Sequence, residues 1–87
     1  MDQETRMEYV RIVWDTFCQV HKIKREISNA EWHLARKWAM TGVPVATVLQ
    51  GIHETTGKIR RLEACDRAVQ ENIGRHGQAV PTYDPPL

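Results

Sequence analysis

The side chains best suited to chemistry in this 87-residue chain are two cysteines and four histidines. Cys18 and His21 are three residues apart, which places both on one face of a helix, whereas Cys65 lies far along the sequence. A closed zinc site needs four converging ligands and usually draws on close Cys or His pairs. His53-Glu54 lacks the second histidine of a zinc-protease helix. We therefore expect no metal and no cofactor, and we interpret the cysteines as buried or half-buried thiols.

The patterns that catalysis requires do not occur in the sequence. We find no nucleophile with a nearby base, no pair of carboxylates in apolar surroundings and no glycine-rich phosphate loop. Glu8 and Asp15 are expected to be solvated. The expectation is that this protein is not an enzyme.

Clusters of basic residues indicate a different chemistry. The chain has a net charge of only +1, with 12 Lys and Arg against 11 Asp and Glu. The positive excess lies in residues 21–75, which hold ten basic and six acidic side chains. Contacts with phosphates need only Lys and Arg arranged along a surface. The clusters are Lys22, Lys24 and Arg25; Arg36 and Lys37; and Lys58, Arg60 and Arg61, with Arg67 further on.

Two interpretations of these clusters remain open. The first is a solvated face, on which the basic charge is balanced by Glu26, Glu31, Glu63 and Asp66. The second is a surface that binds the nucleic-acid backbone without reading sequence. For the second interpretation, the candidate contact residues are Lys58, Arg60, Arg61 and Arg67, with Arg36 and Lys37 beside them.

Three tryptophans in so short a chain predict both a core and a contact point. We expect at least two of the three, Trp14, Trp32 and Trp38, to be core residues. Trp32 and Trp38 are six residues apart, so they lie well apart around a helix, and one of them should be partly exposed. Trp32, if exposed among charges, is a candidate anchor for a protein partner.

Hydrophobic periodicity and capping signals predict the elements that hold these residues. Apolar side chains recur at three- and four-residue steps over four segments, which predict helices at residues 3–21, 29–40, 44–55 and 58–73. Ser28 and Glu31 form a capping box at the start of the second helix, and Gly42 ends it. Gly51 lies inside the third helix and indicates close approach of a neighbouring helix, and Gly74 is expected to end the fourth.

The expected fold is therefore all-α, a compact bundle of four helices in one domain at residues 1–74. Residues 75–87 contain Pro81, Pro85 and Pro86 and are expected to form a flexible, disordered tail. No apolar run is long enough to span a membrane and no signal peptide is recognisable, so a cytoplasmic location and no membrane partner are expected.

The helix–glycine–helix unit around Gly42 invites comparison with a DNA-binding helix-turn-helix. Trp38 occupies a position where that motif needs a small residue. The third helix offers no Lys or Arg, and only Thr47, Gln50 and His53 could reach a base. We therefore favour helices that pack within a bundle over a helix that reads sequence.

Residues 27–73 contain a series of apolar, capping and basic positions at set intervals. They are Ile27-Ser28, Trp38, Gly42, Val48-Leu49-x-x-Ile52 and Lys58-Ile59-Arg60-Arg61-Leu62. In this pattern the segment resembles the C-terminal helical domain of DnaD-type primosomal proteins, and this resemblance implies DNA-associated binding. The family's tyrosine–isoleucine near the last helix is replaced around Ala64-Cys65, and its C-terminal aromatic is missing near Asn72.

Nearly the whole chain also resembles a group of small uncharacterised bacterial all-helical proteins. That resemblance is more specific but implies no activity. It is carried by Tyr9, Val13 and Phe17, by Ile27, Ser28, Glu31 and Trp32, and by the Trp-x3-Gly-Val-Pro motif of Trp38, Gly42, Val43 and Pro44.

Taken together, these patterns favour a non-enzymatic accessory module that binds the nucleic-acid backbone within a larger assembly. The alternative is a protein–protein adaptor or a self-assembling structural subunit, which would use an exposed Trp32 and need no nucleic acid. A short chain with a small core also makes a homo-oligomer a reasonable expectation.

Overall fold

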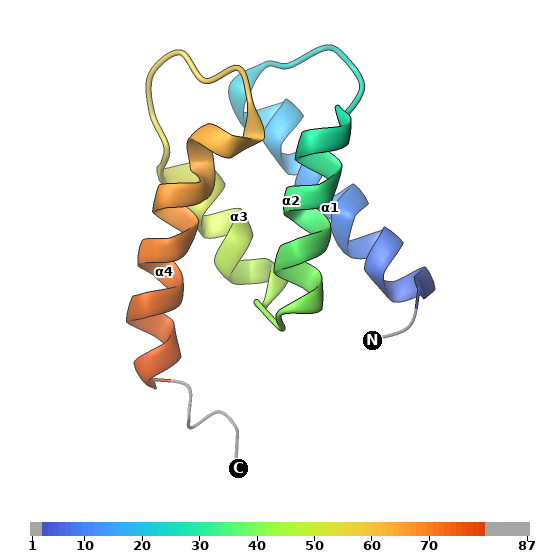
Figure 1. Cartoon of the computed structure of the whole chain (residues 1–87). Helices are drawn as coiled ribbons and strands as arrows, with labels where there is room; N and C mark the ends of the chain where they lie inside the picture. The colour runs from blue at the N-terminus through green and yellow to red at the C-terminus, as the bar shows by residue number, and fades with distance from the viewer. Residues whose placement is uncertain (1–2, 80–87) are drawn as a thin grey trace.

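The computed structural model describes residues 3–79, and these residues form an all-α fold (Figure 1). Four α-helices and one short 3-10 helix follow one another, and no strand occurs within residues 3–79. The expectation of a compact four-helix bundle is confirmed. The elements are α1 (Gln3–His21), α2 (Asn29–Met40), α3 (Val45–Glu54), η1 (Leu62–Cys65) and α4 (Asp66–Ala79).

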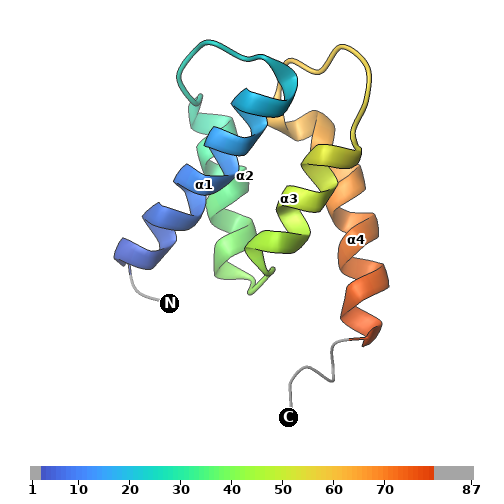
Figure 2. The same ribbon diagram turned by 180° about the vertical axis from the view of Figure 1, so that it is seen from behind.

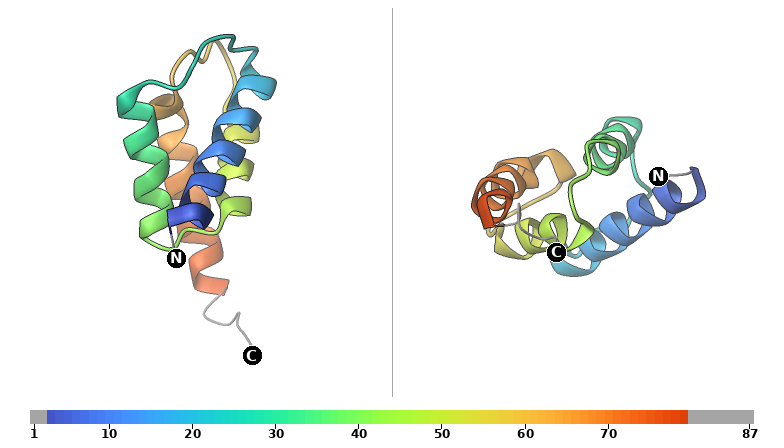
Figure 3. Two further views of the ribbon diagram at one scale, coloured as in Figure 1. Left: turned by 90° about the vertical axis from the view of Figure 1, so that its right-hand side faces the viewer. Right: turned by 90° about the horizontal axis from the view of Figure 1, so that it is seen from below.

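The helices form two layers, with α1 and α3 in one and α2 and α4 in the other (Figures 1 and 2). Helix α1 packs against both α2 and α3, and α3 packs against α4. The short η1, which leads into α4, contacts α2. The contacts therefore run from α1 to α3, α4 and η1 and back through α2 to α1. Figure 3 shows the same arrangement from the side and from below. Consecutive helices run in opposite directions, so both long loops lie at one end of the bundle (Figures 1 and 2).

The core is drawn from all four α-helices and η1, and Trp38 is its largest fully packed side chain at 2 % exposure. Trp14 is half-buried and packs against this core, whereas Trp32 is 37 % exposed. The expectation that Trp32 or Trp38 is partly exposed is confirmed, and Trp32 is the exposed one. Other core residues are Tyr9, Val10, Val13, Phe17, Ala35, Ala39, Val48, Ile52, Leu62, Cys65 and Val69.

Both ends of α2 form as the sequence predicts. The Ser28 side chain accepts from the Glu31 N–H, and the Glu31 carboxylate accepts from the Ser28 N–H, which completes the capping box. At the other end, Gly42 adopts φ +80 and the N–H of Val43 donates to the carbonyl of Trp38 at 3.0 Å. This 6→1 hydrogen bond defines a Schellman motif, in which glycine avoids the strain of the left-handed conformation.

Gly51 marks the close contact that its place in α3 predicts, and the neighbouring helix is α4. A Cβ at Gly51 would lie 2.7 Å from Cγ2 of Val69 and 2.8 Å from its backbone nitrogen. Only a hydrogen fits at this contact, so glycine lets the two helices approach.

The predicted fourth helix was wrong at both ends. Residues 58–61 are not helical; Arg61 is extended at φ −130 and ψ 146, and η1 begins only at Leu62. The extended course follows Gly57, at φ +97, and lets Ile59 pack against the core. At the other end α4 continues through Gly74 to Ala79, because an exposed glycine inside a helix costs only about 1 kcal/mol. The predicted tail boundary therefore falls inside α4, and residues 80–87 lie outside the described residues.

The inner face of α4 contains a polar residue that hydrophobic periodicity does not reveal. Asn72 is fully buried, and its amide donates to the carboxylate of Glu54 and to the carbonyl of Ala68, both at 2.8 Å. Arg75 donates to the same Glu54 oxygen at 3.2 Å. These contacts fasten α4 to the end of α3.

Candidate nucleic-acid interface

The two long loops bring two basic clusters to the same end of the molecule. The α1–α2 loop carries Lys22 and Lys24, and the α3–η1 loop carries Lys58, Arg60 and Arg61. The loops lie side by side at the end from which α2 and α4 begin (Figures 1 and 2). All five side chains are exposed, and none forms a salt bridge with another residue of the described range 3–79. We call these five residues the basic end.

The first loop begins at a tight helix end that turns Lys22 toward solvent. Lys22 adopts φ 58, and the N–H of Ile23 donates to the carbonyl of Cys18 at 3.0 Å. This is another Schellman motif, with a lysine where glycine is usual, and the left-handed conformation costs about 1 kcal/mol for such a residue. Ile23 packs against the core in the next position, which fixes where the loop leaves α1.

A buried carboxylate ties the two loops together. Glu31, in the first turn of α2, is only 1 % exposed. It receives two parallel hydrogen bonds from the guanidinium of Arg25, at 2.7 and 2.8 Å. Its two oxygens also accept from the backbone N–H groups of Ser28, at 3.0 Å, and of Leu62, at 2.9 Å. The first loop, the start of α2 and the start of η1 are thus joined at one carboxylate.

Arg25 extends this link to the second loop. Besides Glu31, it donates to the carbonyl of Arg60 at 2.7 Å, and its guanidinium lies 5.2 Å from the centre of the Trp14 ring. The charge of Arg25 is therefore paired with Glu31, although its side chain is 41 % exposed, and we do not count this residue in the basic end. The interpretation that placed Glu31 on a solvated face does not hold, because Glu31 is buried where it pairs with Arg25.

The protonation behaviour of Glu31 follows from these contacts. Burial alone would raise the pKa of Glu31, because it disfavours the charged form. The hydrogen bonds from Arg25, Ser28 and Leu62 outweigh that effect and hold the pKa at about 2, below the ordinary value of 4.5. Glu31 is therefore ionised near neutral pH, and the link between the loops is a charged one.

Two shallow hollows lie beside the basic end. One, of about 360 Å³, is lined by both loops and includes Lys22, Lys58 and Arg60. The other, of about 380 Å³, includes Arg60, Arg61 and the carboxylate of Glu63. Lysines and arginines around a concave surface can contact phosphate oxygens without contacting bases.

The sequence-predicted contact residues do not all belong to this surface. Lys58, Arg60 and Arg61 do, although they lie on a loop and not on a helix. Arg67 is in the first turn of α4, and its guanidinium is 3.5 Å from Glu71 on the same helix. The structure places the remaining two, Arg36 and Lys37, midway along α2 and away from the loops.

Lys22 and Lys24 were not among the candidate contact residues, although their cluster was recognised. Periodicity along one chain does not say which loops lie together. The signal that could have placed them is the up-and-down order of four helices, because alternate connections in such a bundle lie at the same end.

The surface of α3 is poorly suited to reading bases. Thr47, one of three polar residues that could reach a base, is 8 % exposed and therefore buried. Gln50 donates to Glu54 on the same helix at 3.1 Å. Trp38 fills the core beside the turn, where a helix-turn-helix needs a small side chain.

The structure places two reactive side chains, Cys65 and His21, close together, although they are far apart in the sequence. The sulfur of Cys65 lies 4.0 Å from Nε2 of His21. That nitrogen also lies 3.2 Å from the carbonyl oxygen of Ile52. A carbonyl can only accept, so Nε2 carries the proton and does not act as a base toward the thiol. Burial raises the pKa of Cys65, which keeps the thiol protonated.

Fold and surface together define a small all-α domain with a cationic end. Within residues 3–79 no group of His, Cys, Asp or Glu side chains is arranged to hold a metal ion, and no helix there combines the length and apolarity needed to cross a membrane. Comparison with protein families, with curated proteins and with solved structures found no match to this chain.

Proposed function

We propose that this protein is a non-enzymatic accessory module that binds the phosphate backbone of nucleic acids without reading their sequence, as part of a larger assembly. The observation that carries the proposal is the basic end. Five exposed cations come from two loops at the same end of the bundle, and none is neutralised by a salt bridge within residues 3–79. Phosphate contacts of this kind supply most of the affinity in non-specific nucleic-acid binding.

The link through Arg25 and Glu31 supports the proposal because it gives the two loops a fixed relative position. A surface arranged before binding loses less conformational entropy on binding than two independent loops would. In this account Arg25 positions the contact residues and does not itself bind phosphate. Arg67, in the first turn of α4, is near the same end but pairs with Glu71, so it is a secondary contact in this proposal, and Arg36 and Lys37 are not contacts.

The test compares affinities of the purified protein for a fluorescein-labelled oligonucleotide of mixed sequence, measured by fluorescence anisotropy at several salt concentrations. The variant carries Lys58→Gln, Arg60→Gln and Arg61→Gln. Each lost phosphate contact should lower the slope of log K against log salt by about 0.7 to 0.9. Loss of three contacts should therefore lower the slope by about 2 to 3.

A matched control removes the same charge elsewhere. The variant Arg11→Gln, Arg36→Gln and Lys37→Gln has the same net charge as the loop variant; all three residues lie on α1 or α2, outside the basic end, and none forms a salt bridge within residues 3–79. It should retain nearly the slope of the unaltered protein, with only a small uniform loss of affinity. If both triple variants lose affinity and slope equally, general charge and not the basic end is responsible, and the proposed surface is wrong.

A further inference from the structure

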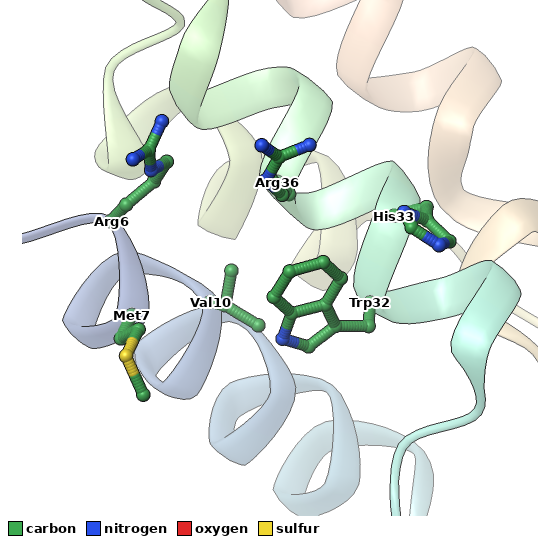
Figure 4. A pocket seen from close by; sticks show the side chains of 6 residues that line it. All are labelled: Arg6, Met7, Val10, Trp32, His33 and Arg36. Atoms are coloured by element: carbon green, nitrogen blue, oxygen red, sulfur yellow. The ribbon is translucent and has the colours of Figure 1, made fainter. Parts of the chain in front are cut away.

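A second surface, on the side of the bundle formed by α1 and α2, has a different chemistry. A groove of about 560 Å³ runs between these helices (Figure 4). Its lining is apolar at the centre, where Val10 of α1 lies beside the indole of Trp32 from α2, and Met7 lines the groove about one turn earlier on α1. Its edges are Arg6, Arg36 and His33. Figure 4 shows the two arginines along the same edge, above the indole.

Half of the large apolar side chains that are exposed within residues 3–79 line this groove. Four large apolar residues within residues 3–79 are exposed, and two of them, Met7 at 59 % and Trp32 at 37 %, line the groove. A third, Met40, is 55 % exposed and lies one helical turn beyond Arg36 on the same face of α2. Only Ile12 lies outside this group. Tryptophan, methionine and arginine are the residue types enriched at protein interfaces.

The charge of the groove indicates what kind of partner it fits. Within the described part of the chain the lining contains two arginines and a histidine and no carboxylate. Neither Arg6 nor Arg36 forms a salt bridge with another residue of 3–79. Arg36 instead lies 5.6 Å from the centre of the Trp32 ring, so it covers one face of the indole and holds a cation at the edge of the apolar lining.

We infer that this groove binds an acidic, amphipathic segment of a partner protein. An apolar side chain of the partner would fill the space between Met7, Val10 and Trp32, and its carboxylates would pair with Arg6 and Arg36. Each guanidinium group can bind a carboxylate through two parallel hydrogen bonds. A nucleic-acid base is a poorer fit, because Arg36 already occupies a face on which a base would stack. The inference does not depend on the proposed nucleic-acid function, because it uses none of the residues of the basic end.

The test is selection from a random-peptide phage library on the immobilised protein, followed by affinity measurements with the selected peptides. The unaltered protein should enrich peptides that combine Asp or Glu with Trp, Phe, Leu or Met. The charge-reversed variant Arg6→Glu, Arg36→Glu should lose these peptides and enrich basic ones. Circular dichroism establishes that each variant is folded before selection.

Trp32→Ala should weaken binding of the selected peptides at least roughly tenfold, as expected for a central aromatic anchor. Ile12→Ala is the matched control, because Ile12 has the same 37 % exposure but lies outside the groove. It should leave peptide affinity within about twofold, a change well below the hot-spot range. The triple variant Lys58→Gln, Arg60→Gln, Arg61→Gln should also retain peptide binding, which separates this inference from the nucleic-acid proposal.

Several results would overturn the inference. These are a failure to enrich peptides, enrichment without acidic residues, and equal binding by Trp32→Ala. Two further measurements, sedimentation velocity and acrylamide quenching of tryptophan fluorescence, test whether the groove binds something other than a peptide. Self-association that disappears in Trp32→Ala would assign the groove to a second copy of the chain. An oligonucleotide that shields Trp32 from acrylamide quenching, also in the basic-end variant, would assign it to nucleic acid.

Discussion

Replacing Glu31 by glutamine should destabilise the protein severely, although the side chain keeps its size. The carboxylate accepts four hydrogen bonds, two from Arg25 and one each from the N–H groups of Ser28 and Leu62. An amide has one oxygen and one NH₂ group, so two of these donors would face another donor. In either orientation of the amide, one Arg25 nitrogen and one backbone N–H, that of Ser28 or that of Leu62, would lose its acceptor.

The size of the effect follows from the pKa of Glu31. Its pKa is lowered from 4.5 to about 2 by the folded structure, and each pKa unit corresponds to about 1.4 kcal/mol. The ionised carboxylate therefore contributes about 3 kcal/mol to the free energy of unfolding at neutral pH. Breaking a buried ion pair typically costs about 3–5 kcal/mol, which agrees with that figure. A small domain has an unfolding free energy of only about 5 kcal/mol at the lower limit.

The lowered pKa of Glu31 also determines how the free energy of unfolding changes with pH. Because the pKa of Glu31 is lower in the folded state, its contribution is fully present above pH 4.5 and is lost as the pH falls toward 2. The unaltered protein should lose stability through that window. The Glu31→Gln variant cannot titrate at this position, so the difference between the two proteins should shrink as the pH falls.

The assay is urea unfolding followed by far-UV circular dichroism, at pH values from 7 down to 3. Glu26→Gln is the control, because Glu26 carries the same charge five residues earlier but is exposed. That control should change the unfolding free energy by no more than about 0.5 kcal/mol. An equally small change for Glu31→Gln at pH 7, or a constant difference across the pH range, would refute the reasoning.

Three further predictions concern packing and backbone conformation. Gly51→Ala should destabilise the protein by about 1–3 kcal/mol in chemical denaturation, because its Cβ would lie 2.7 Å from Val69, whereas Gly74→Ala has open space and should stabilise by up to about 1 kcal/mol. Gly42→Ala should cost about 1–2 kcal/mol in the same assay, since residue 42 has φ +80. Tyr9→Phe should cost about 1 kcal/mol, because the hydroxyl donates a 2.6 Å hydrogen bond to a carbonyl in the α2–α3 turn. An equal effect of alanine at 51 and 74, or no loss at 42 or 9, would contradict these assignments.

The sequence was sufficient to predict the first three helices because their signals are local. The capping box at Ser28, the glycine at 42 and the spacing of apolar residues depend on neighbours within one or two turns, and the structure confirms each. Residues 58–61 were predicted as helix because Ile59 and Leu62 have helical spacing. Their extended conformation depends on distant contacts: the Arg60 carbonyl binds Arg25, and the Leu62 N–H binds Glu31.

The candidate site was predictable in composition but not in arrangement. The sequence shows the basic clusters, yet it does not show that the clusters at 22–24 and 58–61 lie together. It gave no sign that Arg25 is neutralised, because the partner carboxylate of Glu31 already had a local role in the capping box. The sequence pattern reveals the local role of Glu31 in the capping box but not its pairing with Arg25. The six-residue spacing of Trp32 and Trp38 was sufficient to predict that one of them is partly exposed, and the structure shows that it is Trp32.

The central claim, that the basic end is a nucleic-acid-binding surface, is tested most directly by mapping the contact on the protein. Amide chemical shifts of ¹⁵N-labelled protein would be followed by NMR during titration with an oligonucleotide of mixed sequence. The account predicts shifts concentrated at residues 22–24 and 57–61 and in the first turn of α4, which disappear as salt is raised. An absence of shifts at low salt, or shifts confined to α3 or to the groove between α1 and α2, would contradict it.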